Sequence, residues 1–183
     1  TKGMFAFGFW DEQRQKLFLA RDRFGEKPIY YSNTDNQIYF SSDLRSLTNL
    51  FDKKLTLDQF SIESLLKTNF IPNPHSIYTE VKKVQPGTFI QFDCSEYQNN
   101  LKQNFSQHIN NYFKINDYYE KYQNNQYITS EEKVNEAIFN SVNDQLVSDV
   151  PVGCFLSSGI DSSIIAMNIA KIKSNFDTFT IGY

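Results

Sequence analysis

The residues best suited to chemistry form a short polar loop near the C-terminal end of the chain. The loop holds four serines, one glycine and one carboxylate, in the order Ser157, Ser158, Gly159, Ile160, Asp161, Ser162 and Ser163. The hydroxyls are short hydrogen-bond donors, and glycine takes backbone angles that let an anion approach the main chain. A carboxylate beside phosphates is repulsive unless a cation lies between them, so Asp161 indicates a bridging Mg²⁺. The loop therefore predicts a site for a phosphate or a pyrophosphate.

The segments around this loop are typical of a parallel α/β sheet. We expect an apolar strand over residues 152–156, an almost wholly apolar helix over 164–172 and a further strand over 177–181. Units of this order build parallel sheets, and their ligands bind beyond the carboxyl ends of the strands, at a helix N-terminus. A helix cap without any ligand is the simpler interpretation of an isolated serine-rich turn, but the apolar flanks favour anion binding.

Other catalytic motifs fit the chain less well. Its seven glycines form neither GxxxxGK[ST] nor GxGxxG, so the sequence has no Walker loop and no dinucleotide fingerprint. Ser157 as a hydrolase nucleophile would need a small residue two positions earlier, where Phe155 stands. Both histidines, His75 and His108, precede the serine, whereas such hydrolases place theirs after it.

The first part of the chain is β-rich. Strands are expected over residues 4–10, 16–21, 28–32, 37–41 and 88–92, the first of them buried. The polar turn from Asn33 to Asn36 predicts a hairpin. Ser42-Asp43 and Leu57-Asp58 each open a short helix. The second helix reaches Leu66, and the side chains expected on its buried side are Phe60, Ile62, Leu65 and Leu66.

The composition changes after residue 93. Of the 34 residues from 94 to 127, 13 are Asn or Gln and show no hydrophobic period, which predicts a surface linker. Beyond it, Thr129 and Glu132 form a capping box for a helix that ends at Ser148-Asp149. The apolar face of this helix is expected to hold Val134, Ala137, Ile138, Val142 and Leu146.

The charge balance and the cysteines exclude several classes of protein. The formal net charge is -3, with 18 Lys and Arg against 21 Asp and Glu, so we expect no nucleic-acid partner. No apolar run reaches the length of a membrane span, so we also expect no membrane association. Cys94 and Cys154 stand far apart and form no metal motif, which favours a reducing compartment and a cytoplasmic location.

Two separate sets of motifs resemble one family. The segment from Asp149 to Ser163, with Phe179 to Gly182, is similar to the pyrophosphate loop of the glutamine-dependent asparagine synthetases. The earlier half is similar to the later part of that family's glutaminase domain, in residues 3–7, 19–31, 40–47 and 84–88. The resemblance covers nearly the whole chain outside the Asn/Gln-rich segment.

The resemblance implies two incomplete domains of different fold class. Residues 1–93 would be the C-terminal part of a class-II glutamine amidotransferase domain, an α+β sandwich of the N-terminal-nucleophile type. Residues 94–127 would be the linker. Residues 128–183 would begin an α/β domain of the adenine-nucleotide alpha-hydrolase-like kind, which carries the pyrophosphate loop. The chain is therefore expected to be a fragment, inactive by itself.

The resemblance also implies the reaction and its participants. Glutamine would release ammonia through a cysteine nucleophile expected upstream of Thr1, and ATP with Mg²⁺ would activate aspartate as an acyl-adenylate. Ammonia passing through an internal tunnel would then yield asparagine, with glutamate, AMP and pyrophosphate as the other products. Leu156 and Ile181 would line the adenine or ribose. The pyrophosphate and its Mg²⁺ would be surrounded by Ser157, Ser158, Gly159, Asp161 and Ser162, with Asp161 as the metal ligand. The number of subunits is left open, and a homodimer is one alternative.

Some residues keep alternatives open. The family has glycine where this chain has Ser158, so a non-catalytic relative with a blocked ATP loop is one alternative. Another is a related amidotransferase that amidates a sugar acid or a peptide. Thr1 invites comparison with N-terminal threonine nucleophiles, although truncation explains it better. The run Arg21, Asp22, Arg23 is interpreted as a structural ion-pair network beside the Gly25 turn.

Overall fold

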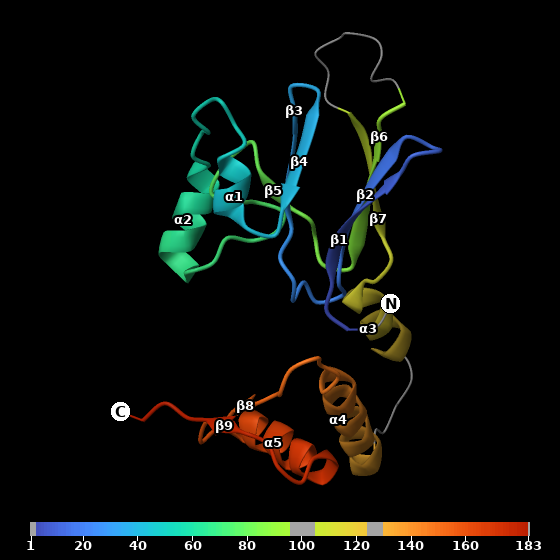
Figure 1. Cartoon of the computed structure of the whole chain (residues 1–183), viewed down its shortest axis with the longest axis vertical. Helices are drawn as coiled ribbons and strands as arrows, with labels where there is room; N and C mark the ends of the chain where they lie inside the picture. Colours follow the sequence, from blue (N-terminus) through green and yellow to red (C-terminus); the bar gives the residue numbers. More distant parts are fainter. Residues whose placement is uncertain (1–2, 96–104, 124–129, 183) are drawn as a thin grey trace. The chain divides into compact units, whose positions relative to one another are not determined.

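The structure, a computed structural model, describes residues 3–95, 105–123 and 130–182. It divides into two compact units, Thr1–Glu120 and Lys121–Tyr183 (Figure 1). The prediction for Thr1 and the parts of the expected linker at 96–104 and 124–127 lie outside the described residues. Among the described helices, none has both the length and the apolar character to cross a bilayer.

The first unit contains two antiparallel sheets. One has the strand order β1-β2-β6-β7, formed by β1 (Ala6–Asp11), β2 (Lys16–Arg21), β6 (Thr88–Asp93) and β7 (Ser106–Asn111). The other has the order β4-β3-β5, formed by β3 (Tyr30–Thr34), β4 (Gln37–Ser41) and β5 (Lys82–Lys83). Figure 1 shows two helices next to this second sheet, α1 (Leu44–Thr48) and α2 (Gln59–Thr68).

Local signals in the sequence account for the turns and helix starts of this unit. Asp35 and Asn36 have φ of 53° and 58°, the left-handed pair that a two-residue hairpin between β3 and β4 requires. Asp43 and Asp58 cap α1 and α2 by accepting the main-chain N–H three residues on. The predicted hairpin and both predicted caps are confirmed.

The buried core joins the two sheets. Its largest cluster combines side chains from β2, β3 and β6 with residues near them, namely Leu19, Ile29, Tyr31, Val84, Ile90 and Phe92. A smaller cluster lies under α1 and holds Leu47, Leu55 and Val81. Apolar side chains of both sheets therefore hold the unit together, since their burial is the main favourable term in folding.

Two burial predictions are wrong. The first strand is an edge strand, and nothing among the described residues covers the side that carries Phe7 and Phe9, the latter 56% exposed. In α2 the buried side chain is Ser61, whereas Leu66 is 80% exposed and Phe60 and Leu65 are exposed too. The apolar pattern identified both elements correctly, but it did not show which side contacts the rest of this unit.

The prediction of a linker over 94–127 is wrong for two segments. Residues 106–111 form β7, which pairs with β6 over six residue pairs, and Ile115–Gln123 forms α3. All six β7 residues are exposed, and their sequence does not alternate between apolar and polar residues. The strand therefore carries no local signal that predicts it. Main-chain hydrogen bonds do not depend on side-chain type, which lets an Asn- and Gln-rich segment join the sheet.

The second unit contains α4 (Glu131–Gln145), β8 (Cys154–Phe155), α5 (Ile160–Ile172) and β9 (Thr178–Phe179). The predicted parallel pairing is confirmed, because β8 and β9 pair in parallel, but each strand is only two residues long. The cap of α4 is Ser130, one residue later than expected, and its hydroxyl accepts from the Lys133 N–H. Thr129 lies outside the described residues.

Candidate functional site

The serine loop leaves the sheet at the carboxyl end of β8, where the sequence places it. The Leu156 N–H donates to the Phe179 carbonyl at 2.9 Å, and the Thr180 hydroxyl donates to the Leu156 carbonyl at 2.8 Å. These bonds fix the start of the loop beside β9. Leu156 is half-buried, and Ile181, which follows β9 at the same edge, is 79% exposed.

The first turn of α5 is part of the loop site. The helix begins at Ile160, not at residue 164, so that Asp161, Ser162 and Ser163 belong to its first turn. This start brings the main-chain N–H groups of the turn, and the positive end of the helix dipole, directly to the loop. An anion in front of the loop would therefore meet both.

Two of the loop hydroxyls hold the loop in shape. The Oγ atoms of Ser157 and Ser162 lie 2.8 Å apart, and the Ser157 N–H donates to Ser162 Oγ at 3.1 Å. Ser163 Oγ donates to the Gly159 carbonyl at 2.8 Å. These three hydroxyls therefore have partners within the loop in this structure, and their role as donors to an anion stays a prediction.

Gly159 has ordinary backbone angles and a close neighbour in the loop. It caps α5 with φ −77° and ψ 152°, an extended conformation open to any residue, so the prediction of unusual backbone angles is wrong. The predicted approach of an anion to its main chain stays a prediction. A Cβ atom at this position would lie 3.1 Å from Ser157 Oγ. No side chain caps the helix, which leaves its first-turn amides facing the loop.

Ser158 occupies an unstrained position. Its φ is not among the positive values of the described non-glycine residues, and its side chain is exposed. Within the described structure its hydroxyl takes part in no hydrogen bond with the loop, unlike those of Ser157 and Ser162. A serine here adds a hydroxyl at the loop surface and requires no backbone strain.

We expect the Ser158→Gly variant of the full-length protein to bind ATP with an affinity within about threefold of the unchanged protein, because one exposed hydroxyl contributes little net free energy. Equilibrium titration with ATP and Mg²⁺ measures this. A gain of roughly a hundredfold (about 2.7 kcal/mol) would instead show that the serine blocks the loop.

Asp161 fits one particular kind of magnesium site. It is exposed and is the acidic residue in the first turn of α5, where a carboxylate also stabilises the helix dipole. No group of three or more acidic, His or Cys side chains within the described residues could hold a metal ion. Mg²⁺ is commonly bound by one or two carboxylates together with substrate phosphates, and Asp161 beside the anion loop suits that arrangement.

The hydrolase interpretation of Ser157 gains no support. The hydroxyl of Ser157 pairs with that of Ser162, and residues 121–183 contain no histidine that could serve as its base.

In the first unit, Asp22 is the centre of a main-chain network. The side chain is 1% exposed, and its two oxygens accept from four main-chain N–H groups, those of Phe5, Phe24, Glu26 and Lys27. Burial pushes the pKa of Asp22 up, but these hydrogen bonds outweigh it and hold the pKa below its ordinary value. The predicted ion-pair network is therefore wrong for this residue, which organises the Gly25 turn through amides.

Arg21 likewise bonds main-chain atoms. Its guanidinium donates to the carbonyls of Gly25, Lys27 and Val84 at 2.7 to 2.9 Å. These bonds tie the Gly25 turn to Val84, which lies two residues before Pro86. The Gly87 N–H donates to the Asp22 carbonyl at 2.8 Å, so the two turns are joined twice.

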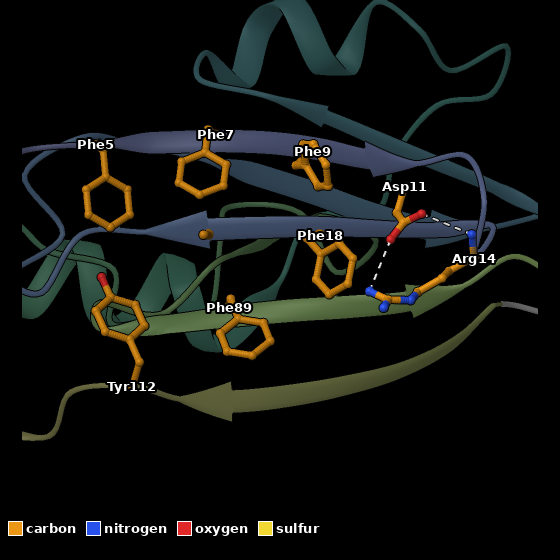
Figure 2. A pocket seen from close by; sticks show the side chains of 9 residues that line it. Phe5, Phe7, Phe9, Asp11, Arg14, Phe18, Phe89 and Tyr112 are labelled. Carbon is orange, nitrogen blue, oxygen red and sulfur yellow. Dashed lines mark hydrogen bonds and ion pairs between the residues drawn. The ribbon is translucent and has the colours of Figure 1, made fainter. Parts of the chain in front are cut away.

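The four-stranded sheet carries an aromatic groove that was not predicted from the sequence. Figure 2 shows the rings on one face of the sheet, and the groove has a volume of about 540 Å³. Its aromatic lining consists of Phe5, Phe7, Phe9, Phe18, Phe89 and Tyr112. The alternation of Phe5, Phe7 and Phe9 was the available signal, and it was interpreted as burial.

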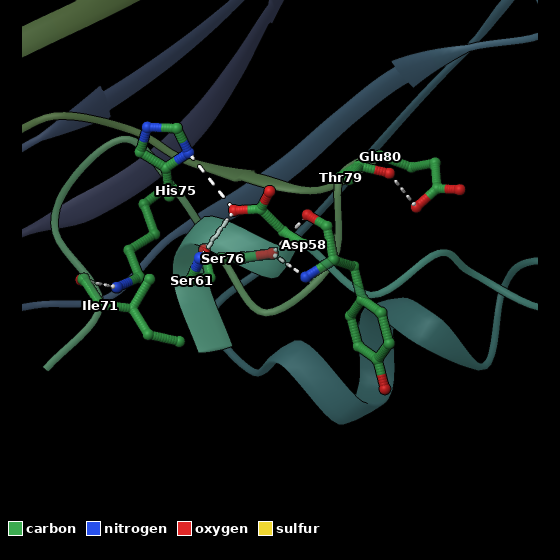
Figure 3. A network of polar contacts seen from close by, with 9 residues as sticks. Asp58, Ser61, Ile71, His75, Ser76, Thr79 and Glu80 are labelled. Carbon is green, nitrogen blue, oxygen red and sulfur yellow. Dashed lines mark hydrogen bonds and ion pairs between the residues drawn. The ribbon is translucent and has the colours of Figure 1, made fainter. Parts of the chain in front are cut away.

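A polar network at the start of α2 has a structural role. Asp58 accepts from the N–H and the hydroxyl of Ser61, and His75 Nδ1 lies 3.7 Å from the same carboxylate (Figure 3). Ser61 is fully buried and bonds Asp58, not His75. The network therefore caps the helix and holds the loop before β5, and it lacks the serine–histidine contact of a nucleophilic site.

Comparison with known proteins shows which sequences the chain resembles. A glutamine amidotransferase domain family model matches residues 1–106, and an asparagine synthase model matches residues 133–183. The chain is 35% identical over its whole length to asparagine synthetase [glutamine-hydrolyzing] 1 of Bacillus subtilis. It is 31% identical, over 99% of its length, to a putative asparagine synthetase [glutamine-hydrolyzing] 2 of Methanocaldococcus jannaschii.

The chain covers only part of the length of each relative. The chain spans 27% of the Bacillus protein and 34% of the Methanocaldococcus protein. The first model covers more than half of the chain, and the second includes the serine loop and α5. The chain therefore belongs to the glutamine amidotransferase domain family, and its C-terminal residues match the asparagine synthase family model.

Proposed function

We propose that the chain is part of an ATP-dependent, glutamine-hydrolysing asparagine synthetase, which converts aspartate, glutamine and ATP into asparagine, glutamate, AMP and pyrophosphate. The observation that carries the proposal is the serine loop at the N-terminus of α5, beyond the parallel β8 and inside the asparagine synthase match. Helix N-termini with open amides are ready sites for phosphate groups.

In this proposal each loop residue has a defined task. The first-turn amides of α5 bind the pyrophosphate part of ATP, Ser158 lies beside it at the loop surface, and Ser157, Gly159 and Ser162 maintain the shape of the loop. Leu156 and Ile181 contact the nucleoside. Asp161 holds Mg²⁺, which when bound neutralises the phosphate charge.

The two domains divide the chemistry. We assign residues 1–93, extended by β7, to the amidotransferase domain that supplies ammonia, and residues 128–183 to the start of the synthetase domain. The cysteine nucleophile would lie upstream of Thr1. Conversion of the aspartate carboxylate into an adenylate provides a good leaving group, and an enclosed path for ammonia keeps water from competing.

Exchange of labelled pyrophosphate into ATP by the full-length protein tests this proposal. We expect exchange that requires aspartate and Mg²⁺ and proceeds without glutamine, because adenylate formation precedes the use of ammonia. Exchange supported by a sugar acid or a peptide carboxylate, and not by aspartate, would show that the protein is a related amidotransferase with a different acceptor. Absence of exchange with every carboxylate would contradict the ligase assignment.

A cytoplasmic location and a homodimer belong to the same proposal. Cys94 and Cys154 are both free thiols, which suits a reducing compartment. Light scattering after size-exclusion chromatography of the full-length protein determines the number of subunits.

A further inference from the structure

A pocket of the first unit contains two cations and no carboxylate among its described lining residues. We call it the Arg21–Lys83 pocket. It has a volume of about 270 Å³, and beside the two cations it is lined by residues that include Asn73, Phe24 and Phe70. It belongs to neither the serine loop nor the aromatic groove, whose residues are different.

The two cations have more hydrogen-bond donors than the bonds they make in the described structure. Arg21 has five N–H groups and makes four bonds in the described structure, to Gly25, Lys27, Asn73 and Val84. The Lys83 ammonium has three N–H groups and donates one of them to the Ile71 carbonyl at 2.7 Å. One donor of Arg21 and two of Lys83 are therefore left for a ligand.

A carboxylate outside the described lining, Asp22, compensates part of the positive charge of this pocket. Burial lowers the pKa of Arg21, and the charge of Asp22, the next residue in sequence, opposes this effect. The oxygens of Asp22 accept from four main-chain amides, so they do not bond the cations of the pocket. Burial, and after it the charge of Arg21, lower the pKa of Lys83. Two like charges in a partly buried position are costly, and an anion between them would remove much of that cost.

The remaining lining limits the size and character of the ligand. Phe24 is 63% exposed, and the Phe70 ring lies 5.5 Å from Lys83 Nζ, so both rings are available to an apolar part of a ligand. The volume is below the roughly 300–1,000 Å³ typical of sites for drug-sized molecules. The site therefore suits a small molecule that carries its negative charge at one end.

We propose that the Arg21–Lys83 pocket binds a small oxyanion, either an organic carboxylate or a phosphate, through the ammonium of Lys83 and the remaining N–H of Arg21. Asn73 and the two phenylalanines complete the site. It is separate from the proposed ATP loop and gives the amidotransferase unit an anion site of its own.

The experiment compares Lys83→Gln with Lys82→Gln in the full-length protein. Glutamine at position 83 keeps a donor for the Ile71 carbonyl and removes the charge, whereas Lys82 is the exposed neighbour that lines a different pocket. Each protein is titrated calorimetrically at low ionic strength with propionate and with inorganic phosphate, against chloride at equal ionic strength. The rate of acetylation of Lys83, followed by mass spectrometry, reports occupancy of this particular site.

We expect Lys83→Gln to raise the dissociation constant at least about fivefold, and Lys82→Gln to change it less than about twofold. Either probe anion should protect Lys83 from acetylation, and the more protective one identifies the ligand as a carboxylate or a phosphate. Lys83→Arg, which keeps the charge, should retain binding if Lys83→Gln is unstable. Equal binding by the Lys83→Gln and unchanged proteins, or no protection beyond that of chloride, would overturn the proposal.

Discussion

We expect replacement of Asp22 by asparagine to lower the free energy of unfolding of the first unit by about 3 kcal/mol at pH 7. The carboxylate accepts four main-chain N–H groups in a site that is 1% exposed. Asparagine has one oxygen, and its amide group would face donors that lose their acceptor. Buried donors without an acceptor carry the full cost of desolvation.

The same residue should give the stability a defined dependence on pH. The folded pKa of Asp22 lies below the value near 3.9 of an unfolded aspartate, so its contribution is present above that value. The contribution is lost as the pH falls through the folded pKa. The unchanged protein should therefore lose stability in this acid range more steeply than the asparagine variant.

Urea unfolding followed by the fluorescence of Trp10 measures both effects. Trp10 is the single tryptophan of the chain and lies in β1, so it reports on the first unit. Asp35→Asn is a matched control, because Asp35 is an exposed turn residue paired with Lys53, and we expect a change below about 0.5 kcal/mol. A difference of less than about 1 kcal/mol for Asp22→Asn would refute the central role of this carboxylate.

The largest expected effect on activity concerns Asp161. We expect Asp161→Asn in the full-length protein to reduce aspartate-dependent exchange of pyrophosphate into ATP at least about a hundredfold, because a neutral amide is a weaker ligand for Mg²⁺. Its effect on folding should be small, because the residue is exposed in the first turn of α5 and asparagine loses only the interaction with the helix dipole.

A matched control and the magnesium dependence make this result specific. Asp177 lies just before β9, at the opposite end of the strand from the loop, and its side chain is exposed. Asp177→Asn should therefore keep normal exchange. Raising the Mg²⁺ concentration should partly restore the Asp161→Asn variant. Exchange at the normal rate in that variant would show that Asp161 is not a ligand of the proposed Mg²⁺.

Short-range signals predicted the parts of the structure that depend on neighbouring residues. Asp43 and Asp58 cap their helices as expected, and the parallel arrangement follows from the order of strand, loop, helix and strand. The serine loop lies between β8 and α5, as predicted, but α5 begins at Ile160 and not at residue 164. The run Ile160 to Ser163 contains good first-turn residues as well as loop residues, and composition does not separate the two.

Long-range contacts explain what the sequence did not reveal. Asp22 accepts from Phe5, and its main-chain carbonyl meets the N–H of Gly87, a partner far along the chain. No local sequence pattern predicts such contacts. The charged run of Arg21, Asp22 and Arg23 therefore indicates an ion-pair network, which the structure does not contain at Asp22. The strand β7 was missed for a related reason, because all its side chains are exposed and only its main chain pairs with β6.

The paired hydroxyls of Ser157 and Ser162 have a consequence for the arrival of a ligand. Either oxygen of the pair is able to donate to the other across 2.8 Å. Rotation of the two O–H bonds reverses the direction of the bond without displacing a carbon, nitrogen or oxygen atom. In the proposed ATP site, one hydroxyl of the pair would therefore be able to turn its proton toward a phosphate oxygen without displacement of the loop's carbon, nitrogen and oxygen atoms.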